Sequence, residues 1–200
     1  MDKKILWVGL TSLAIIVTAT FMTMLFSKSD SFRGTAYNEP YPIAPNFELT
    51  RSSGDSFRLS DQRGKIVLLF FGYTFCPDVC PTTLAELNMA LNEISGDKAD
   101  SVQVVFVSVD PDRDTSQIAQ EYVGRFNPSF IGLSGPLVDL GKIWQDYGIF
   151  REIVKSDSGV ITVSHTARVV LIDKEGNMRL SYGFGTPVED IVYDLNLMLK

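Results

Sequence analysis

The chain has 200 residues, a hydrophobic content of 45% and a formal net charge of −6, which suggests one domain with a sizeable core and additional segments. The acidic balance and the lack of a basic stripe exclude nucleic acid as an expected partner. The N-terminus differs from the rest of the chain, because a stretch of 22 residues without a charge, from Ile5 to Phe26, follows Lys3 and Lys4. Such a stretch is long enough to span a bilayer as a helix.

We expect residues 1–26 to be a single, uncleaved membrane anchor, with a cleaved signal peptide as the alternative. The apolar stretch is longer than that of a signal peptide, and no small-residue cleavage site follows it. The lysines before the span favour a cytoplasmic N-terminus. The sequence therefore predicts a single-pass protein of a bacterial cytoplasmic membrane. Its soluble part would lie on the periplasmic side, where a disulfide is free to form.

The remainder divides into a polar, proline-containing linker, expected at 27–44, and a globular domain, expected at 45–200. The domain opens with two short strands around a Ser-Ser-Gly-Asp turn, and a continuous apolar run at 65–73 then predicts a strand buried on both faces. Leucines at helical spacing predict a helix over 84–94. The later predicted elements are a buried strand at 102–109, helices at 115–126 and 137–147, a hairpin or extended excursion at 149–163, strands at 167–172 and 178–182, and a final helix from 187.

This order of elements indicates an α/β protein with the thioredoxin-like fold. Strand, helix, strand and helix are followed by a closing hairpin and helix, with an N-terminal strand extension and a mid-domain insertion added. The order predicts the class of fold only, and the function must come from the site.

Both cysteines lie in the stretch GYTFCPDVCPT at 72–82, between the first buried strand and the following helix. Pro81 predicts that the helix begins near that residue. Cys80 would then lie at or next to the helix cap, with Cys76 in the preceding turn. Because a helix N-terminus has partial positive charge, it favours thiolate over thiol. Both sulfurs are therefore candidate nucleophiles or metal ligands.

Three other interpretations of the cysteine pair fit the residues less well. A structural disulfide would close only a small loop, so its entropic stabilisation would be limited. A dithiol oxidoreductase usually has C-x-x-C and a cis-proline before the third strand, whereas this chain has C-x-x-x-C and Ser164-His165-Thr166 at the matching place. A peroxidase of the peroxiredoxin type has threonine three residues before the reactive cysteine, and this chain has Pro77 there.

His165 is the only histidine in the chain and precedes the strand predicted at 167–172. A lone histidine is usually an ordinary surface or core residue, but in a thioredoxin-like plan this loop lies against the cysteine turn. Two thiolates and one imidazole form a soft set of ligands, which selects Cu(I) and can hold Cu(II) with a further weak ligand. Zinc stays an alternative, because Asp110 or Asp112 could supply the fourth donor that it requires.

Three separated motifs resemble the Sco/SenC family, in the correct order and over about residues 45–200. They are Cys76-Pro77-Asp78-Val79-Cys80-Pro81, the stretch VSVDPDRDT at 107–115, and His165-Thr166-Ala167-Arg168 with Leu171-Ile172-Asp173. An N-terminal anchor is also usual in that family. The resemblance implies a thioredoxin-like copper protein that assists assembly of the dinuclear CuA centre in subunit II of cytochrome c oxidase.

Carried over residue by residue, the resemblance implies that Cys76, Cys80 and His165 bind copper. Asp110 and the following Pro111-Asp112-Arg113-Asp114, with Asp110 and Asp112 foremost, would border the site and orient the ligands rather than bind the metal. Ser164 departs from the family pattern, in which an acidic residue often precedes the histidine.

The expected function is therefore that of a copper metallochaperone rather than an enzyme. Its expected partners are oxidase subunit II, another copper chaperone or a thiol reductant, and the membrane. Two alternatives stay open: a thiol-disulfide oxidoreductase that uses Cys76 and Cys80 to reduce the acceptor's cysteines, and a redox sensor.

Overall fold

The computed structural model describes residues 12–13, 15–18, 20–22, 31–94, 96–155, 159 and 161–200. The chain divides into two compact units, Met1–Ser31 and Phe32–Lys200. In the first unit, the residues described between 12 and 22 are helical. None of the helices within the described ranges is both long and apolar enough to cross a membrane, and most of the span predicted at 5–26 lies outside those ranges.

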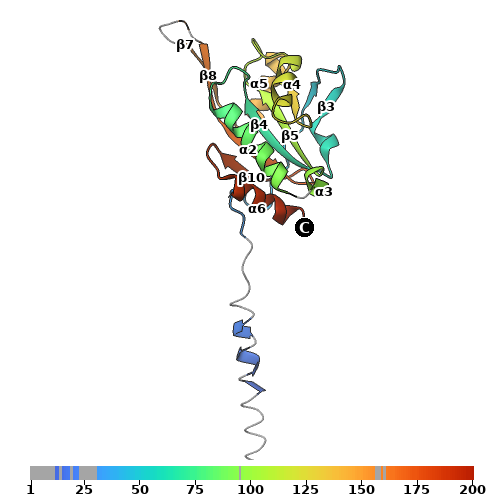
Figure 1. The fold of residues 1–200 in the computed structure, drawn as a ribbon, viewed down its shortest axis with the longest axis vertical. Helices are drawn as coiled ribbons and strands as arrows, with labels where there is room; N and C mark the ends of the chain where they lie inside the picture. The colour runs from blue at the N-terminus through green and yellow to red at the C-terminus, as the bar shows by residue number, and fades with distance from the viewer. Residues whose placement is uncertain are drawn as a thin grey trace, which may run out of the picture. The chain divides into compact units, whose positions relative to one another are not determined.

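The second unit is built, in its described residues, on a six-stranded mixed sheet with the strand order β1-β10-β9-β4-β5-β6 (Figure 1). Its central strand β4 (Ile66–Gly72) pairs in parallel with β5 (Val102–Ser108) and antiparallel with β9 (Arg168–Ile172). Every residue of β4 is buried, as its uninterrupted apolar run predicts. The sheet is completed by β1 (Thr35–Ala36), β6 (Ile131–Leu133) and β10 (Met178–Gly183).

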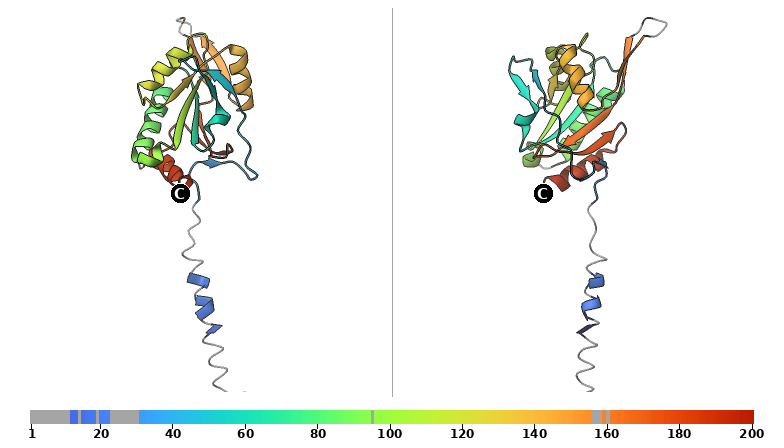
Figure 2. Two further views of the ribbon diagram at one scale, coloured as in Figure 1. Left: turned by 90° about the vertical axis from the view of Figure 1, so that its right-hand side faces the viewer. Right: turned by 180° about the vertical axis from the view of Figure 1, so that it is seen from behind.

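Helices cover both faces of this sheet (Figure 2). On one face lie α2 (Val79–Glu93), α4 (Ser116–Gly124) and α6 (Val188–Met198), and on the other lies α5 (Leu137–Asp146). The short helical segments are η1 (Leu59–Gln62) and α3 (Gly96–Ala99). Two small antiparallel sheets pair β2 (Glu48–Thr50) with β3 (Ser56–Arg58) and β7 (Arg151–Lys155) with β8 (Ile161–His165).

The predicted order of elements is confirmed, including the N-terminal strand extension (β2 and β3) and the mid-domain insertion (β7 and β8). The edge strand β6 was not predicted, because three residues are too few to show a period. Its central Gly132 is required by packing, since a Cβ there would lie 2.3 Å from the carbonyl oxygen of Ala119 in α4.

Residues 32–44, expected to be part of a linker, belong to the folded unit. β1 pairs with β10, and the backbone N–H groups of Arg33 and Gly34 donate to the Asp194 carboxylate at 2.9 and 2.8 Å. Asp194 is fully buried in α6 and also accepts a hydrogen bond from the Tyr182 hydroxyl at 3.2 Å. The segment attaches through these backbone hydrogen bonds and through a few side chains, such as those of Phe32 and Tyr37, that pack against the core. These apolar residues are few and show no period, which explains why the composition indicated a linker.

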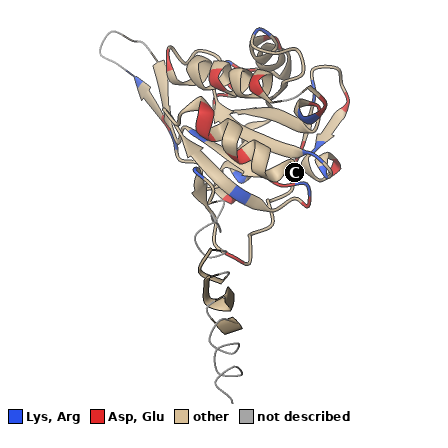
Figure 3. Ribbon diagram, turned by 60° about the horizontal axis from the view of Figure 1, so that its bottom comes forward, with Lys and Arg blue, Asp and Glu red and all other residues tan. Residues whose placement is uncertain are grey.

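Basic and acidic residues are interspersed along the described elements (Figure 3). Several form ion pairs at the surface, such as Arg58 with Glu48 and Lys142 with Asp146. Exposed pairs of this kind contribute about 0–1 kcal/mol each, so the stability of the domain depends on the apolar core around β4.

Gly72, the last residue of β4, limits the space beside the cysteine loop, because a Cβ there would lie 2.8 Å from the Phe106 ring and 2.9 Å from the Cys80 sulfur. We expect Gly72→Ala to lower the free energy of unfolding by about 1–3 kcal/mol, since an added methyl in a filled core forces its neighbours to move. Urea unfolding of residues 31–200 measures the change. Gly183→Ala is the matched control, because nothing lies within 4 Å of a Cβ at that position. Equal stability of the two variants would contradict the close packing of Cys80 on β4.

Candidate metal centre

The cysteine loop joins the carboxyl end of β4 to helix α2. The helix begins at Val79, two residues earlier than Pro81 predicts. The proline is tolerated there because it is still in the first turn, where backbone N–H groups have no acceptor within the helix. Cys80 therefore lies in that turn, and its own N–H group donates to the Cys76 sulfur at 3.4 Å.

The two thiols have different environments, although both are free. Cys80 is fully buried, whereas Cys76 is half-buried. A side-chain hydrogen bond with Cys80 lowers the pKa of Cys76 to about 4, and the same interaction together with burial raises the pKa of Cys80. At neutral pH the pair therefore consists of a Cys76 thiolate beside a protonated Cys80.

His165, the last residue of β8, lies beside this pair. Its Nε2 is 3.8 Å from the Cys80 sulfur, a contact between residues 85 positions apart in the sequence. The imidazole meets the Tyr73 ring edge-on, with 5.7 Å between the ring centroids. Its other nitrogen, Nδ1, is 3.2 Å from the Thr166 carbonyl oxygen, which leaves Nε2 directed at the sulfur. The structure thus brings the predicted histidine to the predicted cysteines.

A hollow of about 340 Å³ opens beside Cys76. One wall is the cysteine loop and the other is β8, and the lining residues are Tyr73, Cys76, Pro77, Asp78, Val79, Thr162, Val163, Ser164, His165 and Ala167. Cys76 and His165 are therefore accessible from the hollow, while Cys80 lies behind them in the core.

Asp110 and Asp112, both predicted to border the site, occupy different positions. Asp110 is buried, forms an ion pair with Nε of Arg113, and donates its backbone N–H to the Ser108 hydroxyl at 2.9 Å. Asp112 is exposed, and none of the hydrogen bonds or ion pairs found among the described residues involves it. The oxygen donor that zinc would require is therefore not placed at the sulfurs by either residue.

Asp114, the last residue of the stretch that the family resemblance places at the border of the site, has a central position. Its buried carboxylate accepts hydrogen bonds from the Thr74 backbone N–H at 3.1 Å and from the Thr74 and Ser108 hydroxyls, each at 2.6 Å. Burial raises the pKa of Asp114. The cap of α4 is Thr115, whose hydroxyl accepts from the Ile118 N–H at 3.2 Å. Asp114 instead ties the cysteine loop to the end of β5.

The donors are close together without forming a finished metal cage. The described residues hold no ready-made group of three or more histidine, cysteine, aspartate or glutamate side chains that could hold a metal ion. Metal–sulfur and metal–nitrogen bonds are about 2.3 and 2.0 Å long, so two such donors on one ion lie about 3.5–4 Å apart. The 3.8 Å between the Cys80 sulfur and Nε2 of His165 therefore fits a shared centre.

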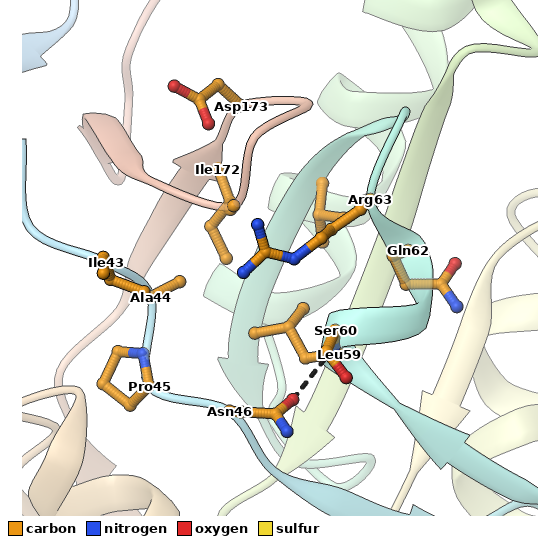
Figure 4. A pocket seen from close by; sticks show the side chains of 12 residues that line it. Ile43, Ala44, Pro45, Asn46, Leu59, Ser60, Gln62, Arg63, Ile172 and Asp173 are labelled. Carbon is orange, nitrogen blue, oxygen red and sulfur yellow. Dashed lines mark hydrogen bonds between the residues drawn. The ribbon is translucent and has the colours of Figure 1, made fainter.

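A second hollow, of about 260 Å³, lies at the opposite end of β4 (Figure 4). Its lining includes apolar residues such as Leu59 and Ile172, and also Arg63 and Asp173, but neither cysteine nor histidine is among the residues that line it. The Asp173 carboxylate is already used by the backbone N–H of Asn177 at 2.7 Å and by other donors. The reactive side chains are therefore at the cysteine end of the sheet.

The fold and the cysteine pair define a thioredoxin-like protein with a C-x-x-x-C loop at the start of a helix. A family model described as SCO1/SenC matches residues 35–200, and the chain belongs to that family. A SCO2-like protein of Rickettsia prowazekii is 34% identical over 142 residues, which cover 70% of this chain and 69% of the relative.

Solved structures of similar proteins agree with this assignment. Apo Sco1 from Thermus thermophilus has a TM-score of 0.75 and 38% identity, covering 86% of this chain and 99% of its own. ScoI from Bradyrhizobium japonicum, solved with copper bound, has a TM-score of 0.70 and 36% identity, covering 78% of this chain and 99% of its own. The thioredoxin-like α/β fold predicted from the sequence is thus confirmed.

The pKa of Cys76 leads to a prediction about its reactivity. A folded pKa of about 4 means that its thiolate persists at neutral pH and disappears only as the pH falls through about 4. An ordinary cysteine loses its thiolate below a pH of about 8.5. We therefore expect iodoacetamide to alkylate Cys76 nearly as fast at about pH 6 as at about pH 8, with Cys80 protected by burial.

Mass spectrometry of the peptides after a short pulse of reagent distinguishes the two cysteines. The control is the same protein unfolded in urea, in which both thiols should behave ordinarily. A Cys76 rate that falls about tenfold for each pH unit below about 8 in the folded protein would contradict the lowered pKa.

Proposed function

We propose that this chain is a copper chaperone in which the sulfurs of Cys76 and Cys80 and Nε2 of His165 bind one copper ion. The observation that supports this ligand set most directly is the 3.8 Å contact between Cys80 and His165. Thiolate and imidazole donors suit Cu(I), and a further weak or solvent ligand would suit Cu(II). Copper is the cargo in this proposal, bound for delivery rather than for catalysis.

The residues present fit such a cargo site. Cysteine binds metal as thiolate, and Cys76 is already in that form at neutral pH because of its lowered pKa. Cys80 would release its proton as the ion binds. Support also comes from the Sco structures of Bradyrhizobium japonicum and Arabidopsis thaliana, at 36% and 33% identity, both solved with copper bound.

The difference in exposure between the two thiols suits transfer by ligand exchange. Cys76 lines the hollow together with His165, so an incoming thiol of an acceptor could reach the ion from that side. Cys80, buried against β4, would stay in place through the exchange. The entering ligand would thus replace the accessible donors first.

We further propose that the acceptor is the CuA domain of cytochrome c oxidase subunit II, with another copper chaperone or a thiol reductant acting before transfer. The SCO1/SenC family assignment supports this choice. The uncharged stretch at 5–26 supports a single-pass anchor in a bacterial cytoplasmic membrane, with residues 45–200 on the periplasmic side.

The ligand set can be tested on a soluble fragment of residues 31–200. When reduced, it should bind one copper ion per chain and show a thiolate-to-Cu(II) absorption band. His165→Ala should lose most of the bound copper on dialysis, because only two protein donors remain. Ser164→Ala is the matched control, since it changes the neighbouring residue of β8 and should retain copper. Equal copper retention by wild type and His165→Ala would remove His165 from the ligand set.

A thiol-disulfide oxidoreductase is the second candidate, and the contrast between the thiols favours it. The Cys76 thiolate would attack an acceptor disulfide and release one acceptor thiol, and Cys80 would then displace the second. A Cys76–Cys80 disulfide forms as the acceptor disulfide is reduced to two thiols, so electrons balance. This reaction does not require His165.

Copper binding and disulfide reduction, each measured on the wild-type fragment and on His165→Ala, separate the two candidates. The chaperone proposal predicts loss of copper binding whatever the reductase rate. If the wild-type fragment held no copper while rapidly reducing a disulfide in the acceptor, the chaperone proposal would fail and the oxidoreductase would replace it.

A further inference from the structure

His165 belongs to a β-hairpin that lies outside the main sheet. Among the described residues, β7 and β8 pair with each other and with no strand of the six-stranded sheet. Four of the five residues of β7 are exposed, and the hairpin projects from the domain (Figure 1). The hydrogen-bonded ladder of the main sheet resumes only at Arg168, the first residue of β9. The position of the imidazole therefore also depends on what holds the hairpin to the domain.

Arg113, in the loop after β5, makes one such attachment. Its Nη1 donates to the carbonyl oxygen of Ile161, the first residue of β8, at 3.1 Å, while its Nε pairs with the buried Asp110 carboxylate. The guanidinium also lies over two rings of the cysteine segment, 5.0 Å from the Phe75 centroid and 5.7 Å from the Tyr73 centroid. One side chain thus contacts the loop after β5, the cysteine segment and the hairpin.

Arg151 makes a second attachment from the other strand of the hairpin. Its Nε donates to the Val109 carbonyl oxygen at 2.5 Å, at the end of β5. Its guanidinium lies 5.1 Å from the Trp144 ring centroid. Arg151 is the residue paired with His165 in the hairpin register, so this attachment acts on the rung that contains the imidazole.

The contacts of the imidazole itself are weaker than these two attachments. The 3.8 Å contact of His165 with the Cys80 sulfur is long, and its contact with Tyr73 is between ring edge and ring face. Hydrogen bonds from a charged donor are stronger than either kind of contact. Beside the hydrogen bond between Tyr73 and the Val163 backbone, the arginines are therefore the charged ties between the hairpin and the domain.

We infer that Arg113 and Arg151 are positioning residues that hold His165 against the cysteine pair. Arg113 does so with a planar fork that reaches Asp110 and Ile161 at once, which the single ammonium of a lysine cannot reproduce. The consequence for copper rests on the proposed function, whereas the placement of the imidazole does not. Loss of either arginine releases the hairpin and leaves the two thiols in place on α2 and β4.

The single histidine of this chain makes the inference directly measurable. Diethyl pyrocarbonate modifies accessible imidazole, so the absorbance of carbethoxyhistidine in the reduced, copper-free full chain in detergent reports on His165 alone. We expect Arg113→Ala and Arg113→Lys to raise the modification rate about tenfold, because each removes a charge-assisted hydrogen bond that holds the hairpin closed. Arg151→Lys should act in the same direction.

Arg63→Ala is the matched control, since Arg63 also donates to a backbone carbonyl, that of Glu175, but lies at the opposite end of β4. Circular dichroism and the urea midpoint separate release of the hairpin from loss of the fold. If Arg113→Ala unfolds, the two lysine variants decide the result. Rates in the folded variants equal to that of Arg63→Ala would overturn the inference.

A copper measurement separates this inference from the proposed function. Arg113→Lys should still bind one ion but about tenfold more weakly, as is usual when a group that orients a ligand is lost. In electron paramagnetic resonance, the Cu(II) form of this variant should lose the coupling to the imidazole nitrogen. Its thiolate-to-Cu(II) absorption band should remain. If the arginine variants are carbethoxylated faster than the wild type, but the wild type binds no copper, the inference is upheld and the chaperone proposal is refuted. If the wild type binds copper, but the arginine variants are carbethoxylated no faster than the wild type, the inference is refuted and the chaperone proposal stands.

Discussion

The contact between the Cys80 sulfur and Nε2 of His165, 3.8 Å across 85 positions of sequence, is the interaction on which the rest of the site depends. The two residues that form it are held in place by different parts of the fold. Cys80 is buried against β4, where only glycine at position 72 leaves room for its sulfur. His165 ends a hairpin that joins the domain through a few side chains. The site therefore combines two thiols placed by the core with an imidazole placed by an insertion.

The two thiols also differ from each other, in exposure and in protonation. The hydrogen bond with Cys80, together with the N–H groups of the helix N-terminus, keeps Cys76 as an accessible thiolate, while the same hydrogen bond and burial keep Cys80 protonated. Asp114 holds the loop that presents them, through Thr74 and Ser108. A metal ion held by such a set can be approached from the side of Cys76 and His165 without disturbing the core, as transfer to a partner requires.

Much of this could be predicted from the sequence, because long apolar runs and regularly spaced leucines specify β4, β5 and α2. The approach of His165 to the cysteines followed from the order of elements. The remainder depends on groups that a sequence does not distinguish: Arg113 and Arg151 bind backbone carbonyls, and β1 attaches mainly through backbone hydrogen bonds. The aspartate-rich loop shows the limit, since Asp110, Asp112 and Asp114 look alike in sequence yet lie in an ion pair, in solvent and in a buried network.

The central claim is that two sulfurs and one imidazole nitrogen of a single chain bind the copper. X-ray absorption at the copper edge tests it most directly, on the loaded full chain and its His165→Ala variant. The account predicts two sulfur neighbours and one imidazole nitrogen in the wild type, with the nitrogen alone lost in the variant. A first shell without sulfur, or one that is unchanged by His165→Ala, would contradict it.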